Sequence, residues 1–463
     1  MNKYQKFRRE NPVFIYKGYE IKEFDDTIEL SYDFVIPELA EFHPKWNFTK
    51  PKGSTEHKFS EDLTFEKLVF SLGMAEAVSY WKSVCAPEMH VKCGELSDIQ
   101  IEWWKKLYFM GLGEFFYVNG IDADFDSFVK IIPSGKFRSS QSEKRKPLSG
   151  CLVPIGGGKD SALTLEILSR NGINCKCYSI NSRKSITETV LTAGLSEDSL
   201  IISKRIFDRS LINLNNEGYL NGHTPFSAIV AFSAEITAYI NRLKYIVLSN
   251  ESSANESTVA GQNVNHQYSK SFEFENDFHI YEQEFLGTGI YYFSFLRPLS
   301  EFHIAKMFTA LKKYLPIFRS CNLGSKVSPD IWCADCPKCL FVCLILSPFL
   351  STSEITEIFG KNLLEQPNML DYFKELTGNS KHKPFECVGS VDEVNLAVSL
   401  ALRRMENTGE KLPLLFRWYK ESGLYIPNTI DERLYVRLNS YDNQNLLPVK
   451  FEKILKQEME RLL

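Results

Sequence analysis

The sequence predicts an α/β protein with a doubly wound parallel sheet at its centre. Short apolar runs alternate with helical stretches between residues 151 and 296, which is the pattern of parallel strands joined by helices. A loop of three glycines follows the first run, and four cysteines are crowded into residues 321–339. These observations predict a ligand-binding sheet in the middle of the chain and a cysteine-rich, helical region after it.

Length and composition limit the classes of protein to consider. The chain has 463 residues, enough for several domains, and its 44% hydrophobic and 13% aromatic residues exclude global disorder. Lys and Arg number 54 and Asp and Glu number 58, so the net charge is −4 and no nucleic-acid partner is expected.

The longest apolar run, Leu340–Leu350, is shorter than the ~20 residues of a membrane-spanning helix. The charged N-terminus MNKYQKFRRE leads into no apolar segment. We therefore expect a cytoplasmic protein with no membrane partner.

Residues 1–132 are predicted to form an N-terminal α+β domain. Residues 13–36 alternate apolar and polar side chains, as antiparallel strands do, whereas residues 65–84 and 98–118 have helical patterns. The polar and basic segment 133–150 is predicted to be a linker.

Residues 151–320 are predicted to form the catalytic domain. Its first strand ends at Ile155, and the glycines and Lys159-Asp160-Ser161 follow at the start of a helix. Glycines allow a sharp turn, and a helix N-terminus adds unpaired N–H donors with a partial positive charge. The loop therefore suits a phosphate, with Lys159 as a further charge and Asp160 as a Mg²⁺ ligand.

This loop resembles the PP-loop of the ATP pyrophosphatases, written Ser-Gly-Gly-x-Asp-Ser, except that Gly156 stands in place of the leading serine. The resemblance implies a PP-loop fold of the adenine nucleotide α-hydrolase type, which binds ATP. The predicted ATP-binding residues are Gly156, Gly157, Gly158, Lys159, Asp160, Ser161 and Asn181.

The predicted zinc ligands are Cys321, Cys333, Cys336 and Cys339. Asp335 and Pro337 indicate a turn that brings three of the thiolates toward one ion, and Cys321 completes a tetrahedral site. Four thiolates leave no open position, so the role is expected to be structural. The spacing resembles the zinc site of 7-cyano-7-deazaguanine synthase, another PP-loop enzyme; the alternative is four buried or free thiols. Cys343 is interpreted as a packing residue, and the remainder of 321–463 as helical.

Eight segments together carry a more specific resemblance. They are GGGKDS, NGHTPFSAI, LSNESSAN, VNHQYSKSFEFE, RPLSE, FRSCN, WCADCPKC and HKPFECVG, in this order. They resemble the UDP-N-acetyl-α-D-muramoyl-L-alanyl-L-glutamate epimerases over residues 100–390, and the likeness includes GLGEFFYVNG at Gly111–Gly120.

The resemblance implies that ATP and Mg²⁺ drive inversion of the terminal L-Glu of UDP-N-acetylmuramoyl-L-Ala-L-Glu, a peptidoglycan precursor. AMP and diphosphate are the other products. Adenylation of the carboxylate removes its charge and leaves a carbonyl that can delocalise a carbanion. A base can then take the α-proton and an acid can return one on the opposite face.

The predicted catalytic residues are Lys159, Asp160, His223, Cys387 and Glu386. The last three are the candidates for proton transfer, because each can titrate near neutrality after a modest change of environment. The predicted substrate-binding residues are Asn250, Glu251, His266, Lys270 and Arg297. The N-terminal domain is expected to help hold the UDP-sugar.

Two other functions fit parts of the pattern. A PP-loop ligase of the 7-deazaguanine type would adenylate a carboxylate and let ammonia attack it, and the loop and the cysteine spacing support this function. The polar segments after residue 220 favour the epimerase. The second alternative is a non-catalytic ATP-binding module, against which the intact Lys159, Asp160 and Ser161 count.

Overall fold

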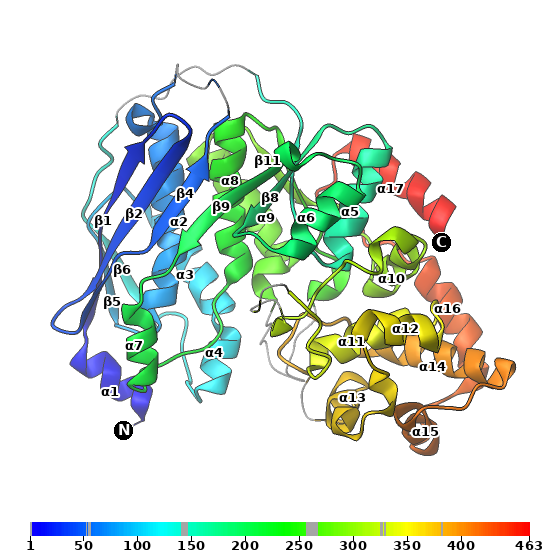
Figure 1. Cartoon of the computed structure of the whole chain (residues 1–463). Coiled ribbons are helices and arrows are strands. Elements are labelled where there is room, and N and C mark those ends of the chain that lie inside the picture. Colours follow the sequence, from blue (N-terminus) through cyan, green and yellow to red (C-terminus); the bar gives the residue numbers. More distant parts are fainter. Residues whose placement is uncertain are drawn as a thin grey trace.

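The computed structural model describes residues 2–51, 53, 57–139, 147–255, 267–324, 327, 330–380 and 383–463. In these parts of the chain, 11 strands form one sheet, and a helical layer lies beyond one end of it (Figure 1). The prediction of an α/β protein is confirmed. The sheet is mixed, however, because parallel strands make up only part of it.

The parallel strands after residue 150 are doubly wound. They are β7 (Cys151–Pro154), β8 (Cys175–Ile180), β9 (Leu200–Ile206), β10 (Tyr245–Leu248) and β11 (Tyr291–Ser294). Their order in space is β9-β8-β7-β10-β11, so the direction of winding reverses between β7 and β10. In such sheets ligands bind beyond the carboxyl ends of the strands at the reversal. A ligand site is therefore expected at the loops after β7 and β10.

The strands before residue 150 extend the same sheet. They are β1 (Val13–Glu23), β2 (Thr27–Ile36), β3 (Ala40–Phe42), β4 (Lys45–Thr49), β5 (Glu88–Val91) and β6 (Lys130–Pro133). The predicted antiparallel pairing within 13–36 is confirmed, with an irregularity of register at Gly18. β4 pairs with β9, so strands from both sides of the predicted linker share one sheet. The boundaries at 132, 150 and 320 stay a prediction.

Helices fill the connections between the strands. Those before the parallel strands are α1 (Lys3–Glu10), α2 (Leu63–Trp81), α3 (Asp98–Gly111) and α4 (Gly113–Val118). Those among the parallel strands are α5 (Lys159–Arg170), α6 (Lys184–Thr192), α7 (Ser210–Asn216), α8 (Phe226–Asn241) and α9 (Phe272–Tyr281). The predicted helix over 98–118 is thus divided at Leu112 into α3 and α4.

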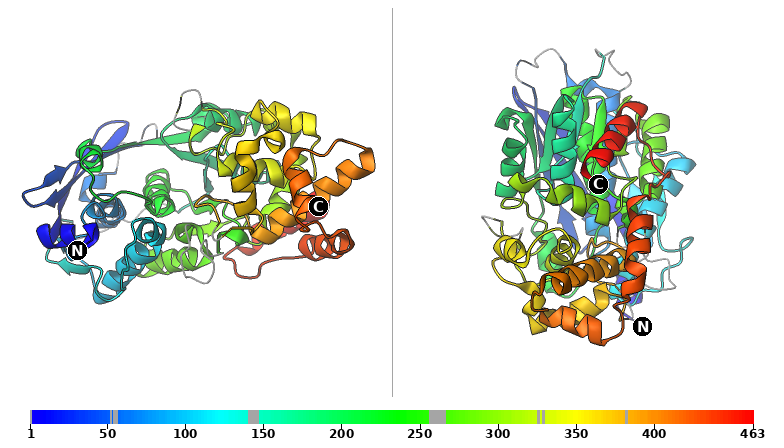
Figure 2. Two further views of the ribbon diagram at one scale, coloured as in Figure 1. Left: turned by 90° about the horizontal axis from the view of Figure 1, so that it is seen from below. Right: turned by 90° about the vertical axis from the view of Figure 1, so that its right-hand side faces the viewer.

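The chain after β11 is helical, as predicted. Its helices are α10 (Glu301–Thr309), α11 (Pro337–Leu346), α12 (Thr352–Phe359), α13 (Leu370–Leu376), α14 (Val391–Thr408), α15 (Leu414–Glu421), α16 (Ile430–Leu438) and α17 (Val449–Leu462). Figure 2 shows most of these helices gathered at the end of the molecule away from β1 and β2.

Alternate side chains of the parallel strands enter two different cores, because successive residues of a strand point to opposite faces. Leu152, Tyr178 and Ile246 join the core with α2, α3, α8 and α9. Val153, Cys177 and Val247 join the core with α5, α6, α10, α11, α14 and α17. The parallel strands are therefore covered on both faces.

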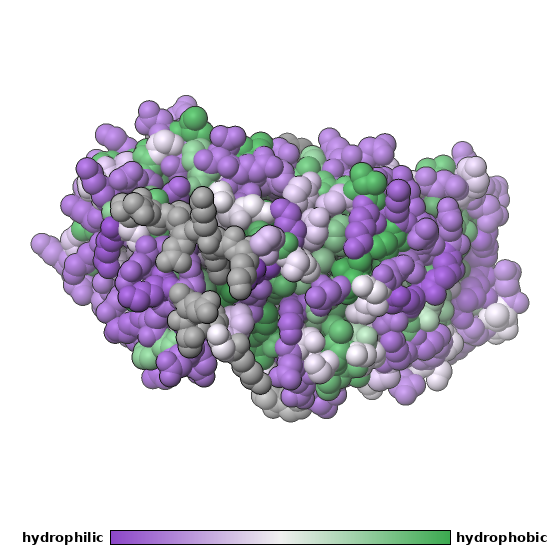
Figure 3. All heavy atoms as spheres, turned by 90° about the horizontal axis from the view of Figure 1, so that it is seen from above, coloured by the Kyte–Doolittle hydropathy of each residue, from purple (hydrophilic) through white to green (hydrophobic). Residues whose placement is uncertain are grey.

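The surface seen in Figure 3 is mostly hydrophilic, with hydrophobic residues showing in patches between. None of the helices in the described parts of the chain is long and apolar enough to cross a membrane. The predicted cytoplasmic location stays a prediction.

A buried ion pair joins the two parts of the sheet. Arg205 of β9 lies opposite Trp46 of β4, and its Nε and Nη2 each lie 2.6 Å from a Glu76 carboxylate oxygen. Trp46 Nε1 donates to the same carboxylate at 2.7 Å. Glu76 has no exposed surface, so α2 fixes both strands of the junction through one fully desolvated carboxylate.

We expect Glu76→Gln to lower the free energy of unfolding by about 3–5 kcal/mol, because it leaves the Arg205 guanidinium buried without a counter-charge. Denaturant unfolding measures this change. Glu61→Gln is the matched control, since the Lys58–Glu61 pair is 71% and 67% exposed. Equal, small losses in the two variants would contradict a structural role for the buried pair.

Candidate functional site

The loop after β7 turns into α5 through glycines that the surrounding protein requires. Gly157 has a φ of +81°, and a Cβ there would lie 2.3 Å from Ser185 Oγ. A Cβ at Gly158 would lie 2.5 Å from Ser320 Oγ. At Gly156, none of the heavy atoms compared among the described residues lies within 4 Å of the Cβ position, so a side chain there would meet open space in this part of the structure.

Lys159, the first residue of α5, is buried between two carboxylates. Its Nζ contacts Asp160 and Glu301, and Glu301 begins α10. Burial by itself would lower the pKa of Lys159, but the two carboxylates raise it above its ordinary value, so the side chain is an ammonium. Burial raises the pKa of Glu301 to about 8, although Lys159 acts in the opposite direction. Glu301 is not among the site residues predicted from the sequence.

The loop after β10 adds a third carboxylate to this group. Glu251 is buried, and its pKa is raised by burial and by the charge of Asp160, against the opposite effect of Lys270 and Lys159. Its neighbour Asn250 donates from Nδ2 to Ser294 Oγ at 3.1 Å. The loops after β7 and β10 thus meet where the sheet reverses, and they bring carboxylate oxygens, the ligands that Mg²⁺ prefers, close to residues 156–161, the predicted phosphate loop.

Arg297 binds these loops together. It has no exposed surface, and Nη2 donates to Glu275 Oε2 at 2.8 Å. Nη1 donates to the Glu251 carbonyl at 2.7 Å and Nη2 to the Lys270 carbonyl at 2.6 Å. The predicted contact of Arg297 with a substrate anion stays a prediction; in the structure, its guanidinium positions two other predicted site residues.

Lys270 and Cys387 are in direct contact. Lys270 ends the short helix η4 (Tyr268–Lys270), and its Nζ lies 3.1 Å from Cys387 Sγ. Lys338, near the start of α11, contacts the carbonyl oxygen of Cys387. The adjacent Glu386 accepts a hydrogen bond from Asn322. The segment that carries two predicted proton-transfer groups is therefore held from η4, from α11 and from the chain beside Cys321.

His223 contacts helix α4, and the same helix contacts the segment that carries Cys387. Its Nδ1 lies 3.1 Å from Glu114 Oε2, and the Tyr117 ring lies 5.4 Å from that of Phe385. Glu114 and Tyr117 are three residues apart, so they occupy the same face of α4. This face brings His223 and the segment of Cys387 into one region.

Two further predicted ATP-binding residues, Ser161 and Asn181, make hydrogen bonds within the protein. Ser161 Oγ donates to the Gly158 carbonyl at 3.3 Å, within the phosphate loop. Asn181 follows β8 at the same edge of the sheet, where its Oδ1 accepts from the Arg205 N–H at 3.2 Å. His266 lies outside the described residues.

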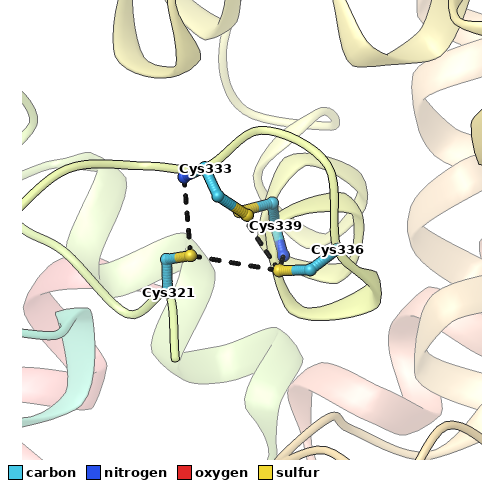
Figure 4. Close-up of side chains that lie close together, drawn as sticks. All are labelled: Cys321, Cys333, Cys336 and Cys339. Atoms are coloured by element: carbon cyan, nitrogen blue, oxygen red, sulfur yellow. Dashed lines mark hydrogen bonds between the residues drawn. The ribbon is translucent and has the colours of Figure 1, made fainter. Parts of the chain in front are cut away.

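The four predicted zinc ligands converge (Figure 4). The sulfur atoms of Cys321 and Cys336 are 4.0 Å apart, and Cys339 Sγ lies 3.5 Å from Cys336 Sγ and 3.7 Å from Cys333 Sγ. Thiolates bound to Zn²⁺ at ~2.3 Å in a tetrahedron are about 3.8 Å apart, so the spacing fits this ion. In the described part of the chain, no other His, Cys, Asp or Glu cluster has three or more ligand atoms within 4.8 Å of one another. Cys343 lies outside the cluster, buried in α11.

The segment around the cysteines also supports the phosphate loop. Arg319, two residues before Cys321, donates its N–H to the Gly157 carbonyl at 2.7 Å. Asp330 accepts from the N–H of Ser185 at 3.2 Å and contacts its hydroxyl, which is the group nearest Gly157. The cysteine segment thus contacts the loop directly through Arg319 and supports it indirectly through Asp330 and Ser185.

Three residues of this region, Glu114, Glu301 and Lys338, are not among those predicted from the sequence. All three occur in segments that carried the resemblance, GLGEFFYVNG, RPLSE and WCADCPKC. Their partners are distant in sequence, so the sequence contained no sign of the pairing.

Comparisons with known proteins agree with one another. A family model described as the MurL N-terminal domain matches residues 5–295, and the MurL C-terminal domain matches residues 317–420. Three relatives are each named UDP-N-acetyl-α-D-muramoyl-L-alanyl-L-glutamate epimerase. The protein of Salinispora tropica is 37% identical over 82% of this chain and 86% of its own length. That of a Micromonospora strain is 36% identical over 73% and 75%, and that of Xanthomonas oryzae is 33% identical over 72% and 74%. No solved structure matches the chain.

We expect Gly157→Ala to destabilise the protein by more than the roughly 1–2 kcal/mol that a left-handed conformation costs an alanine, because the Cβ must also displace Ser185. Ser185 cannot move freely, since Asp330 holds its hydroxyl. Thermal unfolding checks the prediction. Gly156→Ala is the control and should leave stability nearly unchanged; a comparable loss in that variant would contradict the packing argument.

Proposed function

The chain belongs to the MurL family, and from this premise we propose that it inverts the terminal L-Glu of UDP-N-acetylmuramoyl-L-Ala-L-Glu with consumption of ATP. The observation that carries the proposal is the match of the family models to residues 5–295 and 317–420. The charged groups gathered where the parallel strands reverse support it, because they adjoin a loop with the features of a phosphate site.

The chemistry explains why an epimerase of this kind would use ATP. Removal of the α-proton from a free glutamate places a carbanion beside a carboxylate charge. Joining AMP to the carboxylate, with release of diphosphate, removes that charge and leaves a carbonyl that can delocalise the carbanion. Hydrolysis of the acyl-adenylate after inversion would return the carboxylate and release AMP.

The residues of the phosphate loop would serve the first step. The free N–H groups at the start of α5 and the Lys159 ammonium are suited to the charge that develops on the diphosphate. Asp160 would hold Mg²⁺ together with the phosphates of ATP. A bound Mg²⁺ would neutralise part of the phosphate charge. The loop is therefore proposed to be of the PP-loop type.

Inversion needs a proton-transfer group on each face of the α-carbon. We propose Cys387 and His223 for these roles, because His223 and Phe385, two residues before Cys387, contact the same helix α4 from different parts of the chain. Glu114 would stabilise a protonated His223, as a carboxylate beside an imidazole does. Glu386 is the third candidate, and its hydrogen bond from Asn322 directs it toward the cysteine segment.

We also propose that the four cysteines bind a structural zinc ion. The convergence of their sulfur atoms supports this assignment, and the Gly324 N–H, 3.1 Å from Cys321 Sγ, suits a thiolate there. Its benefit to function would be indirect, since the same segment positions the phosphate loop through Arg319 and Asp330.

The proposed activity is tested by incubating the protein with ATP, Mg²⁺ and UDP-N-acetylmuramoyl-L-Ala-L-Glu, followed by chiral analysis of the glutamate and assay of AMP. We expect D-Glu and AMP to form together. Asp160→Asn should lower AMP release about 10²-fold or more, because the metal contact is lost. The exposed Asp198→Asn is the control. AMP without D-Glu would favour the ammonia-dependent ligase, and binding of ATP without AMP would favour a non-catalytic module.

The purified protein should contain about one zinc ion per chain, and Cys336→Ser should lose it, because three thiolates bind the ion less tightly. Elemental analysis measures the metal. The variant should also bind ATP more weakly, through the loosened phosphate loop, and titration calorimetry measures that effect. Cys343→Ser, outside the cluster, should keep the metal. A zinc-free native protein with full affinity for ATP would contradict both statements.

A further inference from the structure

We propose that Lys270 holds Cys387 as a thiolate and so gives this residue the capacity to take the substrate α-proton. This inference rests on the proposed function for its substrate. The contact itself, 3.1 Å between Nζ and Sγ, is a property of the chain alone. It assigns Lys270 a role other than the substrate binding that the sequence predicts for it.

Both partners of the contact are anchored through their backbones. The Lys270 carbonyl accepts from the fully buried guanidinium of Arg297, which Glu275 compensates. The Cys387 carbonyl is contacted by Lys338 from α11. The ammonium and the sulfur are therefore brought together by two separate parts of the fold, and their separation does not depend on flexible surface side chains.

The charges around the pair favour the ionised form of both groups. Burial by itself would lower the pKa of Lys270, but Cys387 and Glu251 raise it above its ordinary value. Lys270 thus remains an ammonium at neutral pH, and an ammonium beside a thiol favours the thiolate. Two further charged groups lie near the pair: Asp160, which also raises the pKa of Lys270, and Lys338 at the Cys387 carbonyl, while the adjacent Glu386 is hydrogen-bonded to Asn322. An ammonium with a raised pKa is itself a poor base, so the base of the pair is the sulfur.

The proton balance of the proposed step is simple. The Cys387 thiolate takes the α-proton of the acyl-adenylate, which forms the thiol and a carbanion delocalised into the carbonyl. The group on the opposite face, proposed to be His223, gives one proton to the carbon, so the substrate gains and loses one proton. The enzyme returns to its first state when the thiol releases a proton to solvent and the imidazole takes one up. Lys270 keeps its protons throughout and acts as a positioning residue.

The first test uses the full-length protein without substrate. Iodoacetamide alkylates Cys387, and mass spectrometry of the peptide that contains this residue measures the rate at a series of pH values. The native protein is compared with the variants Lys270→Met and Lys270→Arg. We expect Lys270→Met to slow alkylation at neutral pH about 10-fold and to move the midpoint of the profile upward. Lys270→Arg, which keeps the cation, should restore most of the rate. Lys312→Met, at an exposed site, is the control.

The second test follows turnover in the same variants. Exchange of the substrate α-proton with D₂O should fall at least 10-fold more than AMP formation in Lys270→Met, whereas a substrate-binding lysine would raise KM for both steps alike. An unchanged alkylation profile in Lys270→Met, or equal losses of exchange and AMP formation, would overturn the inference. If the native protein forms neither AMP nor D-Glu, the proposed function fails, while the alkylation profile still decides the lysine–cysteine pair.

Discussion

A fully buried guanidinium at Arg297 is the constraint on which the candidate site depends. A cation without access to water must be paired and must have its N–H donors satisfied, or its burial costs several kcal/mol. Glu275 of α9 supplies the counter-charge, and the carbonyls of Glu251 and Lys270 accept two of the remaining donors. The hydrogen bonds that satisfy this buried charge therefore fix the backbone at Glu251 and Lys270. These two residues place a carboxylate and an ammonium at the edge of the sheet.

The same site draws on three parts of the chain. The parallel strands supply the phosphate loop, Glu251 and Lys270 at their carboxyl ends. The N-terminal part contributes α4, whose one face carries Glu114 toward His223 and Tyr117 toward the segment of Cys387. The C-terminal part contributes Cys387 itself. β4 pairs with β9, and the buried Glu76 binds Arg205 at this junction. These contacts fix the position of the N-terminal part relative to the parallel strands.

The cysteine cluster and the predicted phosphate loop are connected by direct contacts. Arg319 contacts the loop directly, and Asp330 holds Ser185 against it. Helix α11, capped by Cys336, places Lys338 at the carbonyl of Cys387. A glycine at 157 is needed because this support leaves no room for a side chain beside Ser185. A metal ion in the cluster would thus stabilise both the place where ATP is proposed to bind and the place where the proton is proposed to move.

The sequence by itself determined the α/β class, the glycine turn into α5 and the cysteine cluster, because each depends on local order: the alternation of strands and helices, glycines before a helix, and thiols three residues apart. It also contained the segments on which the family resemblance was based, and the family models match residues 5–295 and 317–420. Only the tertiary structure decided that the N-terminal strands join the same sheet and that Lys159 is buried against Glu301. The contact of Lys270 with Cys387 likewise joins residues 117 positions apart, through loops whose course is fixed by a buried charge. Such pairings arise from packing and desolvation across the whole fold, and no local pattern records them.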